Sequence, residues 1–366
     1  MTAVFGQDGR PRFVYDAHRK MEVLRSARGD RKVVTLHGDV RVVSYGIGQG
    51  YVERPLRPGY VQRDVVMGGR TSVGVYKIVS YQGIVFRRYV PAHYFHPRFY
   101  AWIMAPWPES VSYAWTWRTA PWYGASAAYF APAAVYSDAS LWLTDYVIAS
   151  ELEDAYYTRS MAGVTDPSSQ TPAPWDGQQT ALSPAVKAAI AEEVRQQIAA
   201  DQKAATQPSG APAAAEPPPA VDPMQRVFVV SSNIDAHTSG GSTCTLSAGD
   251  IILRTNDQIS TGKTAAVTVL SSKAGDCPAN SSTTIAVVAL QEMYNEFQQR
   301  LGAGIEVLAQ SQGKDGMPPG PPAGAYSSRD GQGRSDPSAD AALINRQQQE
   351  ADRAESEAVT ASHGGR

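Results

Sequence analysis

The chain contains two cysteines, Cys244 and Cys277. Each lies beside turn-forming residues within one short segment. A disulfide between them would close a loop of about 34 residues and stabilise a small domain by about 3–4 kcal/mol. Small exported domains gain most from such a bond. The alternative is two unrelated thiols. We favour the disulfide, and with it an exported protein.

Arginines in the first third of the chain form a second group that could do chemistry. Residues 1–118 hold 18 Lys and Arg against 8 Asp and Glu, which leaves 15 against 27 in the remainder. Alternate arginines on a strand point to one face, where their charges together would attract an anionic polymer. A solvated hairpin face is the alternative. The candidate anion-binding residues are Arg54, Arg57, Arg63, Arg70, Arg87 and Arg88.

Tryptophans form the third candidate group. The only charges between Phe99 and Ser137 are Glu109 and Arg118. Aromatic rings combine a large apolar body with a polar edge, so they could pack internally or form a contact surface. The candidate aromatic surface comprises Trp102, Trp107, Trp115, Trp117 and Trp122.

Catalytic motifs are not apparent. We find no nucleophile elbow, no His-Glu-x-x-His pair and no linked acid and base. Residues 46–50 imitate part of a nucleotide-binding fingerprint, but they precede strand-like residues, so we interpret them as a glycine-rich turn. His93 and His96 are spaced for a helical metal site, but Pro91 and Pro97 disfavour that helix. We therefore predict no enzymatic activity, no cofactor and no metal site.

Short β-prone runs separated by turn signals fill the first ninety residues. Their spacing of about ten residues predicts hairpins in series, a β-meander or an extended ribbon. A helix beginning at Ser137 or Asp138 then closes a first module, residues 1–161. The predicted strands cover residues 12–15, 20–24, 32–36, 40–45, 60–66, 71–79 and 84–90.

Two predicted linkers flank a single helix. Residues 162–182 read as a linker. Ser183 as N-cap and Pro184 at the first helical position then predict a helix over 183–204. Its apolar stripe is narrow, which predicts either weak pairing with another helix or an exposed helix. The second linker, 205–223, is rich in Pro and Ala.

The last ordered unit is predicted to span residues 224–313 as a small, disulfide-closed α+β module. Its strands are expected at 227–231, 251–254, 265–271 and 284–288, and an amphipathic helix at 290–308. Residues 314–366 offer little to bury and predict a disordered tail, with room for an exposed helix around 339–358.

These elements together predict an α+β chain. It consists of a hairpin-rich or β-meander N-terminal module with a helical segment, the small C-terminal module, and long disordered linkers and tail. Prolines interrupt the most apolar stretch, so no membrane-spanning helix is expected.

Several short runs resemble uncharacterised exported bacterial proteins rich in Tyr and Trp. The resemblance covers about residues 45–160, with similar companions for the 183–200 helix and the 224–319 unit. It implies a compartment and an organisation, and no activity. Such relatives begin with a leader, and residues 1–11 lack the apolar core of one. The runs that carry the resemblance are residues 50–54, 67–71, 88–91, 99–102, 121–124 and 141–146.

Residues 246–253, Leu-Ser-Ala-Gly-Asp-Ile-Ile-Leu, are similar to the strand–turn segment of PDZ domains. That resemblance implies peptide binding, although the loop that captures a peptide carboxylate in such domains is not evident.

The sequence therefore favours a non-enzymatic structural or interaction protein of the cell envelope or extracellular space. Its expected partners are an anionic polysaccharide or another envelope protein, with nucleic acid less favoured. A periplasmic peptide- or protein-binding adaptor acting through residues 224–313 is the alternative function. The expected compartment is periplasmic or extracellular, with the cytoplasm as the alternative. The sequence does not indicate an oligomeric state.

Overall fold

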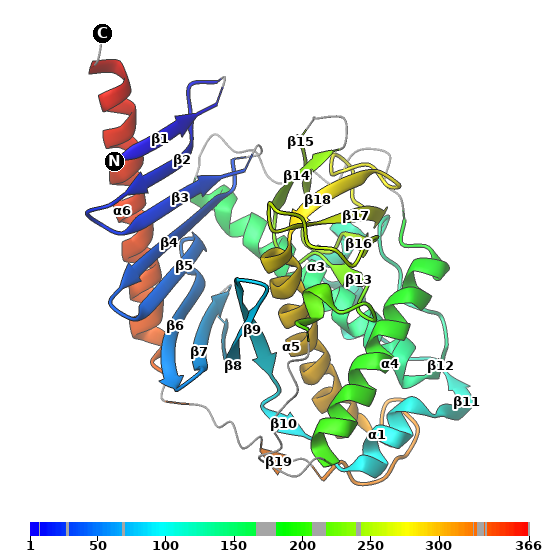
Figure 1. Ribbon diagram of the computed structural model, residues 1–366. Coiled ribbons are helices and arrows are strands. Elements are labelled where there is room, and N and C mark those ends of the chain that lie inside the picture. The colour runs from blue at the N-terminus through cyan, green and yellow to red at the C-terminus, as the bar shows by residue number, and fades with distance from the viewer. Residues whose placement is uncertain are drawn as a thin grey trace.

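A computed structural model describes the chain except for residues 7, 27–28, 68–69, 166–180, 207–216, 239–242, 325, 328–332, 334 and 365–366. Helices and strands both contribute substantially, so the predicted α+β class is confirmed. A long helix, a large antiparallel sheet and a mixed helical and β region lie side by side (Figure 1). Most of the two predicted linkers lies outside the described residues.

The first nine strands form one sheet in which each strand pairs antiparallel with its neighbours in sequence. The predicted β-meander is therefore confirmed. Turn residues between short β-prone runs favour this arrangement because two-residue connections join antiparallel strands directly. The strands are β1 (Thr2–Phe5), β2 (Pro11–Asp16), β3 (Met21–Arg25), β4 (Arg31–His37), β5 (Val40–Gly46), β6 (Gln49–Arg57), β7 (Tyr60–Met67), β8 (Arg70–Tyr81) and β9 (Ile84–Val90).

The glycine-rich segment 46–50 forms the turn between β5 and β6, as the sequence predicts. Gly48 has a φ of 63°, which favours glycine. A Cβ atom on Gly50 would lie 2.1 Å from the carbonyl oxygen of Val43. The glycines therefore serve a tight turn and a close approach of two strands.

A helical region follows the sheet. Asp138 Oδ1 accepts a hydrogen bond from Leu141 N at 3.1 Å, in agreement with the predicted helix start. The elements are β10 (His93–Tyr94), α1 (Pro97–Met104), β11 (Pro106–Val111), η1 (Thr116–Thr119), α2 (Pro121–Ser126), β12 (Tyr136–Asp138), α3 (Ala139–Thr165), α4 (Pro184–Thr206) and η2 (Pro219–Val221).

Helix α4 begins where the sequence predicts, with Ser183 Oγ accepting a hydrogen bond from Val186 N at 3.2 Å. The prediction that this helix is exposed is wrong. Ile190, Val194 and Ile198 are fully buried, because even a narrow apolar stripe suffices when α1 and α3 pack against it.

A second antiparallel sheet has the strand order β13-β16-β17-β18-β14-β15. Helix α5 (Val287–Ser311) packs against it through Leu290 and Met293. The sequence did not indicate β14 or β15. The strands are β13 (Val227–Val229), β14 (Ile234–Thr238), β15 (Thr243–Leu246), β16 (Ile251–Arg254), β17 (Thr264–Ser271) and β18 (Ser282–Ala286).

The largest hydrophobic core joins the two predicted modules. Trp142 and Leu143 of α3 belong to the same buried cluster as Phe297 and Leu301 of α5. The prediction that residues 224–313 form a separate module is therefore wrong, because α5 buries one side against the second sheet and another against α3.

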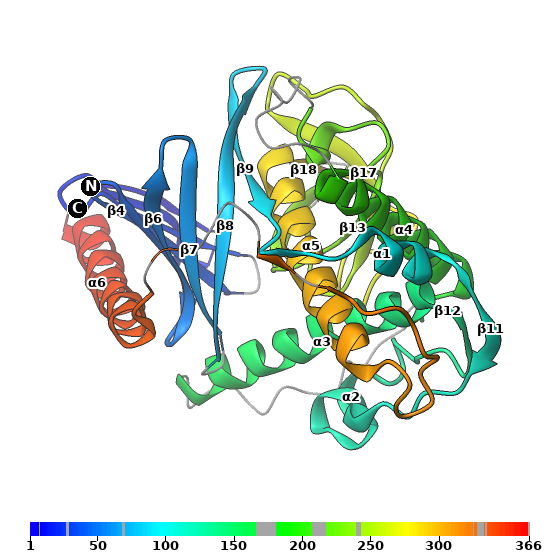
Figure 2. The ribbon, with the colours of Figure 1, turned by 90° about the horizontal axis from the view of Figure 1, so that it is seen from below.

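Helix α6 (Pro337–Gly364) lies across one face of the nine-stranded sheet, while α3 and α5 lie on its other side (Figure 2). Ala351 and Ala354 of α6 are fully buried against Met21 of the sheet. The predicted disordered tail is therefore wrong over residues 337–364, and the helix expected around 339–358 packs on the sheet instead of being exposed. Alanine adds little to sequence hydrophobicity, but it lets a helix approach a valine-rich sheet closely. Earlier in the same segment, β19 (Tyr326–Ser327) pairs with β10.

Candidate functional site

Arg63 is the most enclosed of the predicted anion-binding residues. Only 3% of it is exposed. Its guanidinium donates to Glu53 at 2.7 Å, and to Glu292 of α5 at 2.5 and 2.9 Å. The rings of Tyr51 and Tyr76 flank it at 4.6 and 4.2 Å. Two carboxylates and two rings thus saturate this arginine, and it cannot contact a polymer.

The Arg63 cluster also holds the Glu292 carboxylate in its charged form. Desolvation acts to raise the pKa of Glu292, but the charge of Arg63 and its hydrogen bonds outweigh this effect, and the pKa is lowered. Arg87 shares Glu53, which its Nε contacts at 2.6 Å. The cluster therefore joins the sheet to α5 as a structural contact.

The remaining predicted arginines are engaged elsewhere. Arg54 pairs with Asp64 at 2.9 Å and with Asp340 of α6. Arg70 is exposed and pairs with Asp154 of α3 at 2.6 Å. Arg57 lies 3.9 Å from the centre of the Tyr60 ring.

The strand register divides the six arginines between the two faces of the sheet. Arg63, Arg70 and Arg87 lie on the face toward α3 and α5, and Arg54, Arg57 and Arg88 lie on the opposite side by register. Arg54 faces α6, whereas Arg88 on the edge strand β9 lies near Asp201 of α4 and Tyr294 of α5. The hypothesis that most of them share one basic face is therefore wrong. A sequence pattern of alternate positions could not show it, because the register shift at Pro55 changes the alternation within β6.

The tryptophans belong to the core. Trp107, Trp115 and Trp122 are buried, and Trp102 and Trp117 pack partly buried against the same cluster. The expected aromatic contact surface is therefore wrong, and the alternative of internal packing holds.

Trp115 is an internal ring whose polar edge has a partner. Its ring stacks on Trp142 with centroids 5.0 Å apart. Its Nε1 donates to the Tyr136 hydroxyl at 2.7 Å, and that hydroxyl donates to Asp145 at 2.7 Å. The polar edge thus has a partner inside the protein.

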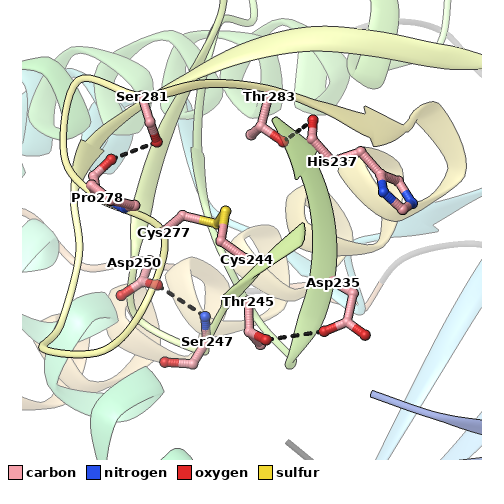
Figure 3. Close-up of a disulfide and its surroundings, with 10 residues drawn as sticks. All are labelled: Asp235, His237, Cys244, Thr245, Ser247, Asp250, Cys277, Pro278, Ser281 and Thr283. Carbon is pink, nitrogen blue, oxygen red and sulfur yellow. Dashed lines mark hydrogen bonds between the residues drawn. A yellow bond between two sulfur atoms is a disulfide. The ribbon is translucent and has the colours of Figure 1, made fainter. Parts of the chain in front are cut away.

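Cys244 and Cys277 form the predicted disulfide, with an S–S distance of 2.03 Å and Cα atoms 5.0 Å apart. The bond connects β15 with the loop between β17 and β18 (Figure 3). The similarity of residues 246–253 to a PDZ segment stays a prediction. In the structure, these residues run from the end of β15 through a turn into β16.

A surface that the sequence did not single out lies on strands β1 to β4, on the side away from α6. Four large apolar side chains there are more than a third exposed. We call this area the open face, because no described residue of the chain covers it. The four exposed side chains are Val4 (56%), Tyr15 (39%), Leu24 (40%) and Leu36 (49%).

Register makes the open face continuous. Leu24 lies between Phe13 and Lys32 on neighbouring strands, and Tyr15 lies opposite Glu22. The signal was present in β3 and β4, where apolar residues occupy positions of both parities. Apolar and polar residues do not alternate strictly along these strands because both faces carry apolar side chains.

Comparisons of the chain with protein-family models, with curated proteins and with solved structures find no match. In the part of the chain that the structure describes, no helix is both long and apolar enough to cross a membrane. The same residues contain no cluster of three or more His, Cys, Asp or Glu that could hold a metal ion.

Proposed function

We propose that this chain is a non-enzymatic structural and interaction protein of the cell envelope or extracellular space, and that it binds another protein through the open face. The observation that carries this proposal is the continuous apolar surface of β1 to β4. Single exposed apolar residues are normal, whereas a contiguous patch is typical of interaction sites.

Charge on the open face favours one kind of partner. Lys32 is exposed there, and Arg41 is half-buried on the next strand, where it donates to the Tyr51 hydroxyl at 3.2 Å. Glu22 is the exposed carboxylate of the same face. Two cations beside apolar side chains fit a protein surface that presents apolar groups next to Asp or Glu.

A protein partner is a better fit than an anionic polysaccharide. Polyanion binding through charge needs accessible cations whose fields add. Most of the predicted arginines instead form ion pairs with carboxylates of this chain. The apolar residues of the open face would also contribute little to a highly hydrated polymer.

Export is the part of the proposal that rests on the disulfide. Disulfides persist in oxidising compartments and are rare in the cytosol. The pairing of Cys244 with Cys277 supports a periplasmic or extracellular location.

Site-specific photo-crosslinking in the producing cells tests the partner. A photoreactive residue at Leu24 and, separately, at Leu36 should yield an adduct with the same acidic protein. The matched control is Val288 of α5, which is 44% exposed. Lys32→Glu should reduce the adduct. Equal adducts at Val288, or an adduct with a second copy of this chain alone, would contradict the proposal.

A second measurement separates protein binding from polyanion binding. The double variant Leu24→Glu and Leu36→Glu should lose the crosslink from an unaltered reporter position at Tyr15. Retention on a heparin-like polysaccharide at physiological salt, with equal retention of the double variant, would instead assign the function to charge alone.

A further inference from the structure

A lysine and an aspartate lie fully enclosed in the second sheet region. Lys273 follows β17, and Asp250 precedes β16. Both side chains are 0% exposed, and Lys273 Nζ lies 2.5 Å from Asp250 Oδ1. A second carboxylate, Asp276, is also buried and places Oδ2 3.8 Å from the same nitrogen.

Neighbouring segments seal this group from solvent. The Tyr129 ring lies 5.2 Å from Lys273 Nζ, and its hydroxyl donates to the Gly249 carbonyl at 2.8 Å. A Cβ atom on Gly249 would lie 2.7 Å from a methyl group of Leu152 on α3, so the turn packs tightly against that helix. Water therefore has little access to the amine and the carboxyl group.

The disulfide holds the two segments that carry these residues. Cys277 directly follows Asp276, and its amide donates to the Thr245 carbonyl at 2.9 Å. Asp250 lies beside the disulfide and accepts a hydrogen bond from Ser247 N (Figure 3). Ser247 Oγ in turn donates to Asp276 at 2.6 Å. The side chains of Lys273 and Asp250 are thus held in place against each other.

Burial changes which protonation state is favoured. With every group ionised, one ammonium would face two carboxylates in an enclosed site, at a high cost in desolvation. Burial raises the pKa of Asp250 to about 6, although Lys273 opposes the shift. Transfer of one proton across the 2.5 Å contact would give the neutral amine and the neutral carboxylic acid that a condensation requires.

We propose that Lys273 and Asp250 condense to an intramolecular amide. The Nζ lone pair forms a bond to Cγ of Asp250, the bond from Cγ to the hydroxyl breaks, and one water leaves. Asp276 takes a proton from the nitrogen and delivers it to the departing hydroxyl. The step needs no oxidant or co-reactant, and holding the two groups in contact supplies the usual advantage of an intramolecular reaction.

The chain contains a natural comparison in Lys187 and Asp145. Their Nζ and Oδ1 atoms are 2.6 Å apart, but Lys187 is 14% exposed and also donates to the Ala131 carbonyl. Asp145 accepts hydrogen bonds from Ala133 N and the Tyr136 hydroxyl. This pair should remain an ordinary ion pair.

Intact mass spectrometry of the full chain tests the proposal. After reduction of the disulfide, the folded and purified protein should weigh one water less than its sequence. Proteolysis should yield one branched peptide that joins Lys273 to Asp250, while Lys187 is recovered unlinked. A reduced chain of full sequence mass, with Lys273 in a linear peptide, would overturn the proposal.

Variants separate the reaction from the fold. Lys273→Met and Asp250→Ala should each restore the full mass. Asp276→Asn keeps both reacting groups and most of the volume, so it should slow or abolish the loss of water while near-UV circular dichroism stays like that of the parent. A native-like Asp276→Asn protein that forms the amide at the parental rate would overturn the role of Asp276.

Discussion

On one face of the nine-stranded sheet, Met21 and Val33 are fully buried beneath α6, whereas on the other face of the same strands Leu24 and Leu36 are 40% and 49% exposed. Both faces are apolar, and only one has an internal cover. In the isolated chain, these strands pack against another element on one side only. The difference shows where this fold is complete and where a partner would complete it.

Charge distinguishes the faces as well. Carboxylates of α6 reach Arg19 at 2.8 Å and Arg25 at 2.5 Å, and further ones contact Arg31 and Arg54. The basic character of residues 1–118 is therefore matched by acidic residues more than 280 positions later. The basic residues that the sequence suggested would bind an external polyanion largely pair with carboxylates of the chain itself.

Removal of α6 should cause the largest loss of stability in the first sheet. A chain that ends at residue 336 would expose several Val and Met side chains, each worth roughly 1.5–3 kcal/mol when buried. Backbone amides of β2 to β5 should lose most of their protection in hydrogen exchange. The second sheet should keep its protection, and a peptide of residues 337–364 should restore the first. Unchanged exchange in β2 to β5 would show that α6 contributes little.

Substitution of Arg63 tests the contact between the first sheet and α5. Arg63→Met should destabilise the protein by about 3–5 kcal/mol, because Glu53 is left buried with less compensation. The measurement is chemical denaturation. Adding Glu53→Gln should recover much of the loss, since the double variant removes the uncompensated charge. Additive losses would mean that the two residues act independently.

Met21 and Leu24 provide a matched pair on opposite faces of β3. Met21→Ala should cost about 2–5 kcal/mol because it leaves a cavity beneath α6. Leu24→Ala should change stability by less than about 0.5 kcal/mol, as expected of an exposed position. Thermal unfolding of the two single variants measures both. A large cost at Leu24 would show that the open face is covered in solution, by another copy or by another part of the chain.

Acid should weaken the α6 side by a smaller amount. Burial opposes ionisation of Asp16, but its hydrogen bonds with Arg19 outweigh burial, so the pKa falls below 3.8. The hydrogen bond from Arg19 also lowers the pKa of Glu357 from 4.5. A lowered folded-state pKa means that this stability is present above about pH 4 to 5 and is lost as the pH falls through the lowered values.

The measurement is stability against pH for the parent and for Arg19→Met. The variant should lose less stability between pH 5 and pH 2 than the parent does, whereas Glu22→Gln on the open face should follow the parent. Identical slopes for Arg19→Met and the parent would remove this contact from the acid response.

Local patterns predicted the elements well. The predicted run 84–90 is β9, and 251–254 is β16. The predicted cap at Ser183 starts α4. The β6 strand was only partly recognised, because Gly50 and Pro55 weaken a strand pattern even where a hairpin tolerates them.

Long-range pairing could not be predicted in the same way. Gln347 of α6 donates to the Val42 carbonyl and to Thr35 Oγ1, across more than 300 residues. No local pattern indicates which sheet an alanine-rich helix will cover. The disulfide was the one candidate site predicted correctly, because it requires only that its two members lie in the same small region. The arginine surface failed because carboxylates of α6, α5 and α3 pair with Arg54, Arg63 and Arg70. The tryptophan surface failed because the rings pack on one another and on Trp142 of α3.

Helix α6 also has a consequence for the order of events during synthesis. The ribosome completes all nine strands of the first sheet long before it reaches residue 337, so the nascent sheet waits with both of its faces apolar. A chain of this design has little to gain from folding early and is exposed to aggregation if it does. Such a chain is better held extended until α6 has been made. A chain cut short before that helix would leave Met21 and Val33 of the sheet without their cover.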